Sequence, residues 1–190
     1  MKYNAFFIDK VIIIRIKDIE NTRVEKRNNI TIMYHNEDII GYNIFNVESD
    51  LLTGGLLKQS EELNDLINNE LKKEDLPLLE VDNNKYFIVG YVKECTPFKD
   101  SKKLHLCQVD LKEKMVQIVC GSINIKQDIK VVVALPNAVF KDGTWIKDGK
   151  VMNVESHGMI CSDKELGLSE VSHGAYIVGD DYMIGDSFFD

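Results

Sequence analysis

The stretch NVESHGMICSDKELGL, residues 153–168, decides how the second half of this chain is interpreted, because it joins an extended run to a helix-capping signal. In an extended run, side chains two residues apart share a face, so Ser156 and His157 point to opposite faces. That geometry argues against Ser156 as a nucleophile with His157 as its base. Gly158 lets another backbone or a ligand approach closely, and Met159 offers an adaptable apolar surface. The run therefore suits either a binding edge or the end of a core strand.

The end of the same stretch explains its remaining reactive residues by packing and capping. Cys161 lies between an apolar residue and a helix cap, where core packing accounts for it better than catalysis does. Ser162 and Glu165 form a capping box, in which the serine oxygen accepts from a backbone N–H and the glutamate reaches back. We expect one short helical turn here and assign no catalytic residue. An enzyme that uses Cys161 or His157 is the least favoured interpretation.

Short strand-like runs separated by turns precede this stretch. Asp142-Gly143 and Asp148-Gly149 predict tight hairpin turns, because such dipeptides tolerate positive φ. Five or six short strands in about 75 residues indicate a small barrel or sandwich. The runs are YFIVGYVKEC (86–95), LHLCQVDL (104–111), MVQIVCG (115–121), IKVVVALP (129–136), AVF (138–140), TWI (144–146) and KVMNV (150–154).

The first half of the chain predicts a small antiparallel sheet and one helix. Strand-like runs occur at residues 11–16, 31–34 and 39–47, with a polar segment at 18–29 between the first two. In residues 60–77, Ser60 can cap a helix of about four turns that Pro77 stops. Its apolar face consists of Leu63, Leu66, Ile67 and Leu71. Packing that face on the sheet closes an α+β domain.

The polar turn at residues 82–84 is the expected boundary between two domains. We therefore expect a small α+β domain of unknown role over residues 1–84 and a second domain over residues 85–190. The predicted fold class is mainly β with α+β.

Composition excludes several classes of protein. The 190 residues are 44% hydrophobic and 28% charged, which are the proportions of an ordinary globular protein. The longest apolar run is far shorter than the roughly 20 residues of a membrane span. The N-terminus has no apolar segment followed by a cleavage site, so a cytoplasmic protein is expected. The four cysteines have no metal-binding spacing and are interpreted as small buried hydrophobic residues, and no metal or cofactor is predicted.

Charge is unevenly distributed along the chain. The net charge is −8, which by itself argues against nucleic acid. Residues 86–150, however, carry eleven lysines against seven Asp and Glu, whereas residues 151–190 carry one lysine against eight. No arginine follows Arg27, so bidentate recognition of a base or phosphate is not expected from the second domain. Any RNA binding by these lysines should depend on shape, although a solvated surface explains them too.

The motifs of the second half resemble a known family. Residues 86–178 resemble the tRNA-binding domain of the β subunit of bacterial phenylalanyl-tRNA synthetase, of methionyl-tRNA synthetases and of free-standing tRNA-binding proteins. With its added N-terminal domain and the run IIGYNIFN, the chain is similar to YtpR-type free-standing bacterial proteins. The matching pieces are IVGYV (88–92), KKLHLCQVD (102–110), IVCGSIN (118–124), VVVALPNAVF (131–140), Lys150 and VESHGMICSDKELGL (154–168).

The resemblance implies a fold and a set of contact residues. The fold is an OB-type five-stranded barrel that binds oligonucleotides on an exposed face. The implied RNA contacts are Lys102, Lys103, Asn124, Lys150, Ser156 and Met159. Lysine side chains can contact phosphates, Asn and Ser can hydrogen-bond to ribose or base edges, and Met can pack against an unstacked base.

The chain departs from the family pattern at two places. The loop PFKDSKKL (97–104) is about two residues longer than in the family, and Met152-Asn153 replaces Arg-Gly. The catalytic domains of the synthetases are absent from the matched residues, so aminoacylation is not carried over.

These observations are compatible with two main functions. The first is a non-catalytic tRNA-binding protein that recognises the general shape of tRNA. The alternative is a protein-interaction module on a drifted OB-fold, which the acidic C-terminal segment and the missing arginine favour. The resemblance also implies a homodimer, and the acidic N-terminal domain suits a protein partner. No membrane partner is expected.

Overall fold

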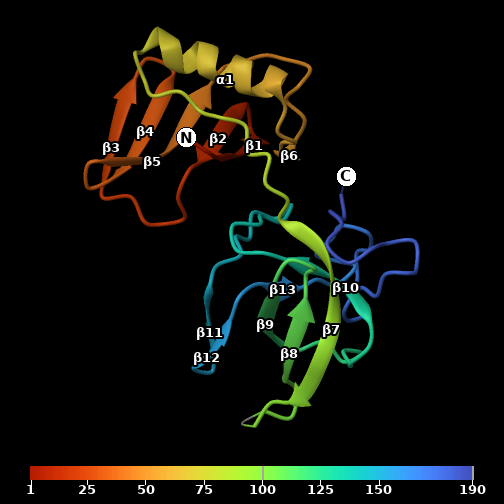
Figure 1. The fold of residues 1–190 in the computed structure, drawn as a ribbon. Coiled ribbons are helices and arrows are strands. Elements are labelled where there is room, and N and C mark those ends of the chain that lie inside the picture. Colours follow the sequence, from red (N-terminus) through yellow and green to blue (C-terminus); the bar gives the residue numbers. More distant parts are fainter. Residues whose placement is uncertain (100, 190) are drawn as a thin grey trace. The chain divides into compact units, whose positions relative to one another are not determined.

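The computed structural model describes residues 1–99 and 101–189, and it divides the chain into two compact units, Met1–Asn83 and Asn84–Asp190. The division falls in the polar turn at residues 82–84. The assignment of separate domains to residues 1–84 and 85–190 stays a prediction. The predicted fold class is confirmed, because the chain is mostly β-structure with a single helix in the first unit (Figure 1).

The first unit is a six-stranded antiparallel sheet with one helix across one face (Figure 1). Alternating burial along the strands explains the arrangement, since Ile12, Ile14 and Ile44 are fully buried under the helix while their neighbours are not. The strand order is β3-β4-β5-β2-β1-β6. The elements are β1 (Asn4–Ile8), β2 (Val11–Arg15), β3 (Arg23–Arg27), β4 (Ile30–His35), β5 (Asp38–Phe45), β6 (Gly55–Leu56) and α1 (Glu61–Lys73).

Helix α1 forms as the sequence predicts. The Ser60 Oγ accepts from the Leu63 N–H at 3.2 Å, and Leu63, Ile67 and Leu71 are buried against the sheet. After the helix, the buried Asn68 side chain exchanges two hydrogen bonds with the Leu79 backbone, each 2.9 Å long. This pair fixes the return segment against the helix.

Two strands of this sheet lie where the sequence predicts none. β1 lies before the first predicted strand, and β3 occupies the segment at 18–29 that was interpreted as a polar connection. β3 is an edge strand, and its charged side chains hide the strand pattern. The guanidinium of Arg23 stacks on the Tyr34 ring at 3.7 Å, which explains how such a polar strand is held.

The second unit is a five-stranded sheet of order β13-β10-β7-β8-β9 that curls into a nearly closed barrel of OB type. A separate hairpin, β11-β12, precedes β13 (Figure 1). The strands are β7 (Phe87–Pro97), β8 (His105–Asp110), β9 (Met115–Cys120), β10 (Lys130–Ala134), β11 (Gly149–Val151), β12 (Val154–Ser156) and β13 (Met159–Ile160).

Both faces of strand β10 are covered. Val131 and Val133 pack into the barrel interior with Val109 and Ile118. Val132 packs into a second cluster outside the barrel, where the C-terminal segment adds aromatic rings. That segment also pairs with β7, since the Val89 N–H donates to the Asp186 carbonyl at 2.9 Å. The sequence did not indicate this covering role for the C-terminal segment.

One of the two predicted Asp-Gly turns is confirmed and the other is wrong. Gly143 has φ +87°, and the Asp142 carboxylate accepts from the Thr144 N–H at 2.9 Å. Gly149, by contrast, lies in β11. The hairpin turns at Met152-Asn153, whose φ values of 49° and 65° are the left-handed pair that a tight hairpin needs, so the predicted strand 150–154 is broken in its middle.

Candidate nucleic-acid interface

Residues 155–158 close the barrel by joining the β12 segment to β9. The His157 N–H donates to the Gln117 carbonyl at 2.9 Å, and the Gln117 side-chain amide donates to the Glu155 carbonyl at 2.9 Å. The Ser156 Oγ accepts from the Val119 N–H at 3.1 Å. These bonds satisfy backbone groups of β9 that would otherwise form an open sheet edge.

Ser156 is a buried residue whose hydroxyl both donates and accepts a hydrogen bond inside the barrel. Besides accepting from Val119, it donates to the Gly158 carbonyl at 3.2 Å, and only 7% of the residue is exposed. Contact of Ser156 with RNA stays a prediction. Its observed position is structural, because its donor and one acceptor lone pair already have partners.

Gly158 brings the same segment against β10. Its φ is +130°, and a Cβ atom at this position would lie 2.7 Å from the Ala134 carbonyl oxygen. Only glycine tolerates both this conformation and this approach. The pattern Ser156, His157, Gly158 is therefore a barrel-closing element, with Ser156 facing β9 and Gly158 facing β10.

Asn124 links the loop after β9 to a loop near the C-terminus. Its side-chain amide donates to the Ala175 carbonyl at 2.9 Å, and its carbonyl oxygen accepts from the Ala175 N–H at 2.7 Å. Gly174, with φ +105°, leaves the room that the Asn124 side chain occupies. Asn124 thus clamps two loops together, and its contact with RNA also stays a prediction.

Lys102 and Lys103 lie in the loop between β7 and β8, and both are exposed. The Phe98 N–H donates to the Leu104 carbonyl at 2.9 Å, which closes the base of the loop, and the Lys103 N–H donates to the Ser101 hydroxyl at 3.2 Å. Among the residues that the structure describes, no carboxylate forms an ion pair with either lysine. Both side chains are open to solvent.

The structure brings these lysines close to the Asn124 loop. His105 and Cys120 are paired in the β8-β9 ladder, so the loops that precede β8 and follow β9 meet at one end of the barrel. A Cβ atom on Gly121 would lie 3.4 Å from the Leu104 side chain, which places the two loops in contact. Ser156 lies near the same end, beside Val119.

Lys150 and Met159 lie on β11 and β13, outside the loops that carry Lys102, Lys103 and Asn124. Lys150 is exposed on β11 opposite Glu155, and its Nζ lies 4.0 Å from that carboxylate. Met159 is half-buried and pairs with Ala134, which in turn pairs with Phe87 at the start of β7. Because β7 ends near Lys102, Met159 belongs to the other end of the barrel, so the six predicted residues do not form one cluster.

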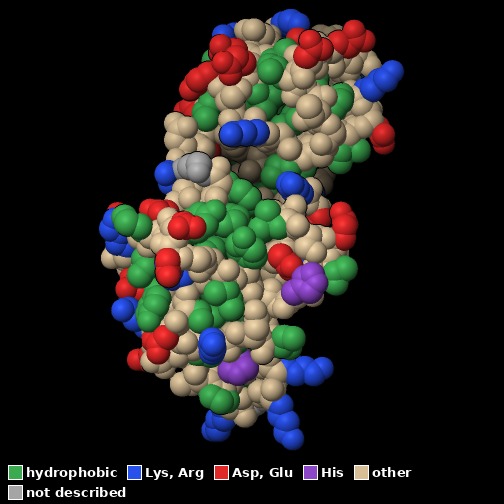
Figure 2. Space-filling model, turned by 90° about the vertical axis from the view of Figure 1, so that its right-hand side faces the viewer, with side chains coloured by type: hydrophobic (Ala, Val, Ile, Leu, Met, Phe, Trp, Pro, Cys, Tyr) green, Lys and Arg blue, Asp and Glu red, His purple; other side chains and the backbone are tan. Residues whose placement is uncertain are grey.

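The loop end of the barrel is positively charged. Figure 2 shows Lys and Arg side chains gathered at the lower end, where the β7-β8 loop lies in Figure 1, with no described acidic side chain beside them on the face drawn. The Asp163 carboxylate already has polar partners, since His173 Nδ1 lies 2.5 Å from one of its oxygens. That contact, together with bonds from the backbone N–H groups of His173 and Lys164, lowers the pKa of Asp163 below its ordinary value.

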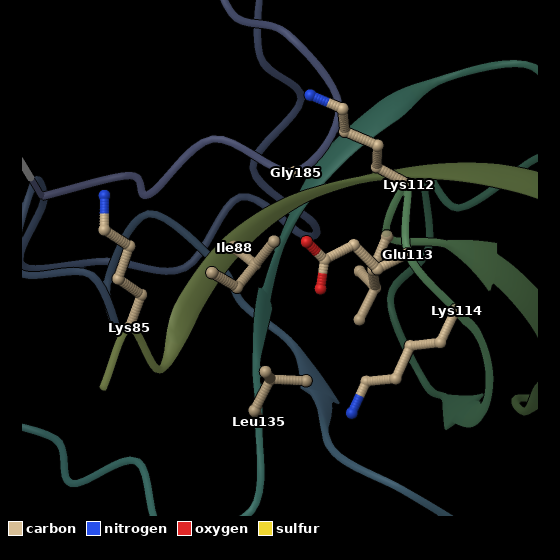
Figure 3. Close-up of a pocket in the computed structure, with 8 residues that line it drawn as sticks. Lys85, Ile88, Lys112, Glu113, Lys114, Leu135 and Gly185 are labelled. Atoms are coloured by element: carbon tan, nitrogen blue, oxygen red, sulfur yellow. The ribbon is translucent and has the colours of Figure 1, made fainter.

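A second group of lysines surrounds a hollow of about 370 Å³ at the other end of β8. Lys85, Lys112 and Lys114 ring it, and Ile88 belongs to its apolar lining. Figure 3 shows the Glu113 carboxylate directed into the hollow among these groups. A carboxylate there opposes phosphate binding.

The possible nucleophile of this region is buried. Cys161 is fully inaccessible, and burial raises the pKa of its thiol to about 12. His157 does not contact it in the structure, because its Nδ1 lies 3.0 Å from Asp148 and its Nε2 lies 3.7 Å from Glu155. Burial disfavours the thiolate form of Cys161 and keeps solvent reagents away from it.

Three contributors to this interface were missed in the sequence. Gln117 carries the closing bonds, and His173 with Asp163 holds the loop that Asn124 clamps. Their partners lie 10 to 40 residues away along the chain, so no local spacing indicates them. The capping box at Ser162 and Glu165 was predicted and is confirmed, with the Ser162 N–H donating to the Glu165 carboxylate at 2.6 Å.

Within residues 1–99 and 101–189, no helix has the length and apolar character needed to cross a bilayer.

Comparison with known proteins agrees with this geometry. Residues 87–187 match the family described as "Putative tRNA binding domain", and residues 17–82 match a domain of unknown function, DUF4479. The chain is 35% identical over 198 residues to "Putative tRNA-binding protein YtpR" of Bacillus subtilis, with 98% of this chain and 97% of that protein covered.

The second unit alone also matches part of a larger enzyme. It is 44% identical over 112 residues to the phenylalanine–tRNA ligase β subunit of Lactiplantibacillus plantarum and 46% identical over 109 residues to that of Streptococcus pyogenes. These matches cover 55% and 54% of this chain but only 14% of each ligase subunit. The chain belongs to the tRNA-binding domain family.

Proposed function

We propose that this chain is a non-catalytic tRNA-binding protein that recognises the general shape of tRNA through its C-terminal barrel. The observation that carries the proposal is the exposed pair Lys102 and Lys103, which no described carboxylate neutralises, at the loop end of an OB-type barrel. Such barrels bind single-stranded or unstacked nucleic acid across their faces and loops. Family membership supports the same function, and it does not favour a protein-interaction module.

The lysines supply the attraction in this proposal. Lys102 and Lys103 contact phosphates directly, and Lys150 adds a third charge once RNA displaces its long contact with Glu155. Asn124 and Ser156 hold the loops and the barrel edge that present these charges. Base contacts by Asn124, Ser156 and Met159 remain part of the proposal that only a complex can test.

Recognition of shape follows from the residue types. Lysine is a point charge on a flexible stem, and unlike arginine it offers no planar fork for guanine or phosphate. All basic side chains of residues 86–150 are lysines. The protein should therefore bind different tRNAs with similar affinity.

The proposal also covers the cellular compartment and the partners of the protein. All four cysteines are free thiols, which agrees with a reducing cytoplasmic compartment. We assign no catalytic step to the chain. A homodimer would double the basic end, and the first unit, whose sequence is acidic, is proposed to meet a protein partner.

Filter binding of the intact chain to tRNA at 50 and 200 mM salt tests the function. The three proposed lysine–phosphate contacts give a slope of about 2.1–2.7 in log affinity against log salt, which is about twenty- to fortyfold over this range. Binding that is undetectable at low salt, or that does not respond to salt, would remove the proposal.

A pair of double variants locates the site. Replacing Lys102 and Lys103 with Ala should reduce the slope by about 1.4–1.8, since each phosphate contact contributes about 0.7–0.9. Lys112 and Lys114, replaced in the same way, are the control because they carry equal charge at the other end of β8. An equal loss in both double variants would show that only net charge matters.

A further inference from the structure

Three of the four cysteines converge on neighbouring strands of the barrel. Cys95 lies on β7, Cys107 on β8 and Cys120 on β9, and all three belong to or pack against the barrel core. Cys95 and Cys107 are directly paired in the β7-β8 ladder, and their sulfur atoms are 3.9 Å apart. The fourth, Cys161, lies in the separate cluster outside the barrel.

Strand geometry singles out one pair for a disulfide. Directly opposed residues of antiparallel strands have Cα atoms about 4.5–5.5 Å apart, which lies inside the range of about 4.4–6.8 Å that a disulfide requires. Cys120 pairs with His105 and is therefore diagonal to Cys107, at about 7–8 Å. Cys95 and Cys120 are two strands apart, or about 10 Å. Only Cys95 and Cys107 meet the requirement.

The sulfur atoms of Cys95 and Cys107 differ in their accessibility to solvent. Cys95 is half-buried, whereas Cys107 is fully inaccessible and burial raises the pKa of its thiol. An oxidant from solvent therefore reaches Cys95 first. Cys107 then lies in position to complete the bond, because its sulfur is already in contact with that of Cys95.

We propose that Cys95 and Cys107 form a peroxide-sensitive modification site that closes to a reversible disulfide. The Cys95 thiolate attacks one oxygen of hydrogen peroxide, the O–O bond breaks, and hydroxide leaves while Cys95 becomes a sulfenic acid. The Cys107 sulfur attacks the Cys95 sulfur while its proton passes to the departing oxygen, so that the S–O bond breaks and water leaves. In total the two thiols lose two electrons and two protons, and the peroxide becomes two water molecules.

The disulfide would tie together the strands on either side of the β7-β8 loop. That loop carries Lys102 and Lys103, so the bond would restrict the part of the barrel that the proposed function places against RNA. The chemical proposal does not depend on RNA binding, because it rests on strand register and sulfur contact alone. Its test therefore measures thiols, not affinity.

The test treats the reduced, full-length chain with hydrogen peroxide, blocks free thiols with iodoacetamide under denaturing conditions, and maps the peptides by mass spectrometry. The expected result is an intramolecular link between the peptides of Cys95 and Cys107, with Cys120 and Cys161 alkylated, and complete reversal by dithiothreitol. A Cys107–Cys120 link, only intermolecular links, or sulfinic acid at Cys95 without a link would overturn the proposal.

Two variants sharpen the result. Cys95→Ser changes the half-buried member, so the barrel core is preserved, and it should leave all three remaining thiols alkylatable after the same treatment. Cys161→Ser is the matched control and should form the Cys95–Cys107 link like the unsubstituted chain. The peptide map of the unsubstituted chain decides the proposal even if a variant fails to fold.

Discussion

Gly158→Ala should open the barrel, because Gly158 lies where the closing segment crosses β10. At φ +130° an alanine is strained by about 1–3 kcal/mol. Its Cβ would also lie 2.7 Å from the Ala134 carbonyl oxygen, so β13 must move away from β10. Together we expect a loss of about 2–4 kcal/mol in the free energy of unfolding of the second unit.

The chain offers a probe for the second unit alone. Trp145 is the single tryptophan, and it lies in the second unit, paired with Val139. Its fluorescence during urea unfolding therefore reports on the barrel without a contribution from the first unit. With a denaturant dependence of about 1.5 kcal/mol per M, the midpoint should fall by about 1–3 M.

Gly149→Ala is the control for this experiment. Gly149 lies on the adjacent hairpin, has no positive φ, and has no atom within 4 Å of an added Cβ. Its substitution should change the unfolding free energy by less than about 0.5 kcal/mol. If Gly158→Ala unfolds at the same urea concentration as Gly149→Ala, the segment does not close the barrel and the reasoning fails.

Three further outcomes can be measured. Ser156→Ala leaves a backbone N–H of β9 without its acceptor and should cost the second unit about 1–3 kcal/mol in the same fluorescence assay; an unchanged midpoint would contradict the hydrogen bond. Met152→Arg, at the exposed hairpin turn, should raise the salt slope of tRNA binding by about 0.7–0.9, whereas Met115→Arg at the start of β9 should not. His173 lowers the pKa of Asp163 in the folded chain below its value of about 3.9 in the unfolded chain. The ionised carboxylate therefore stabilises the fold above about pH 4, and this stabilisation is lost as the pH falls through the folded-state pKa. Between about pH 4 and pH 2, Asp163→Asn should therefore lose less stability than the unsubstituted chain, as followed by Trp145 fluorescence.

Local signals in the sequence predicted the elements that depend on local bonds. Ser60 begins α1, and Ser162 with Glu165 forms the capping turn, because each serine meets a backbone N–H three residues away. The number of short strands in the second half likewise indicated a small barrel. The charged strand β3 was missed because its side chains face solvent at a sheet edge, where no apolar alternation is required.

The features that could not be predicted depend on contacts between residues far apart in the sequence. Asp148-Gly149 is the better turn sequence, but the pairing of Gly149 with Ser156 places the turn at Met152-Asn153, where a methionine must adopt positive φ. Alternation correctly separates the faces of Ser156 and His157, but it does not show that Val119, 37 residues earlier, occupies the serine hydroxyl. The exposed state of Lys102 and Lys103 agrees with the expected interface, and their contact with RNA remains to be measured.

The charged edge of the first unit has a consequence for how copies of the protein behave at high concentration. An open sheet offers unpaired backbone groups that can template the addition of a foreign strand. In β3, Glu25 is held between Arg23 and Arg27 at 3.0 and 2.6 Å, so an approaching strand would have to strip water from three fixed charges. The opposite edge, β6, is only two residues long. This sheet is thereby protected from cross-β aggregation without a covering subunit.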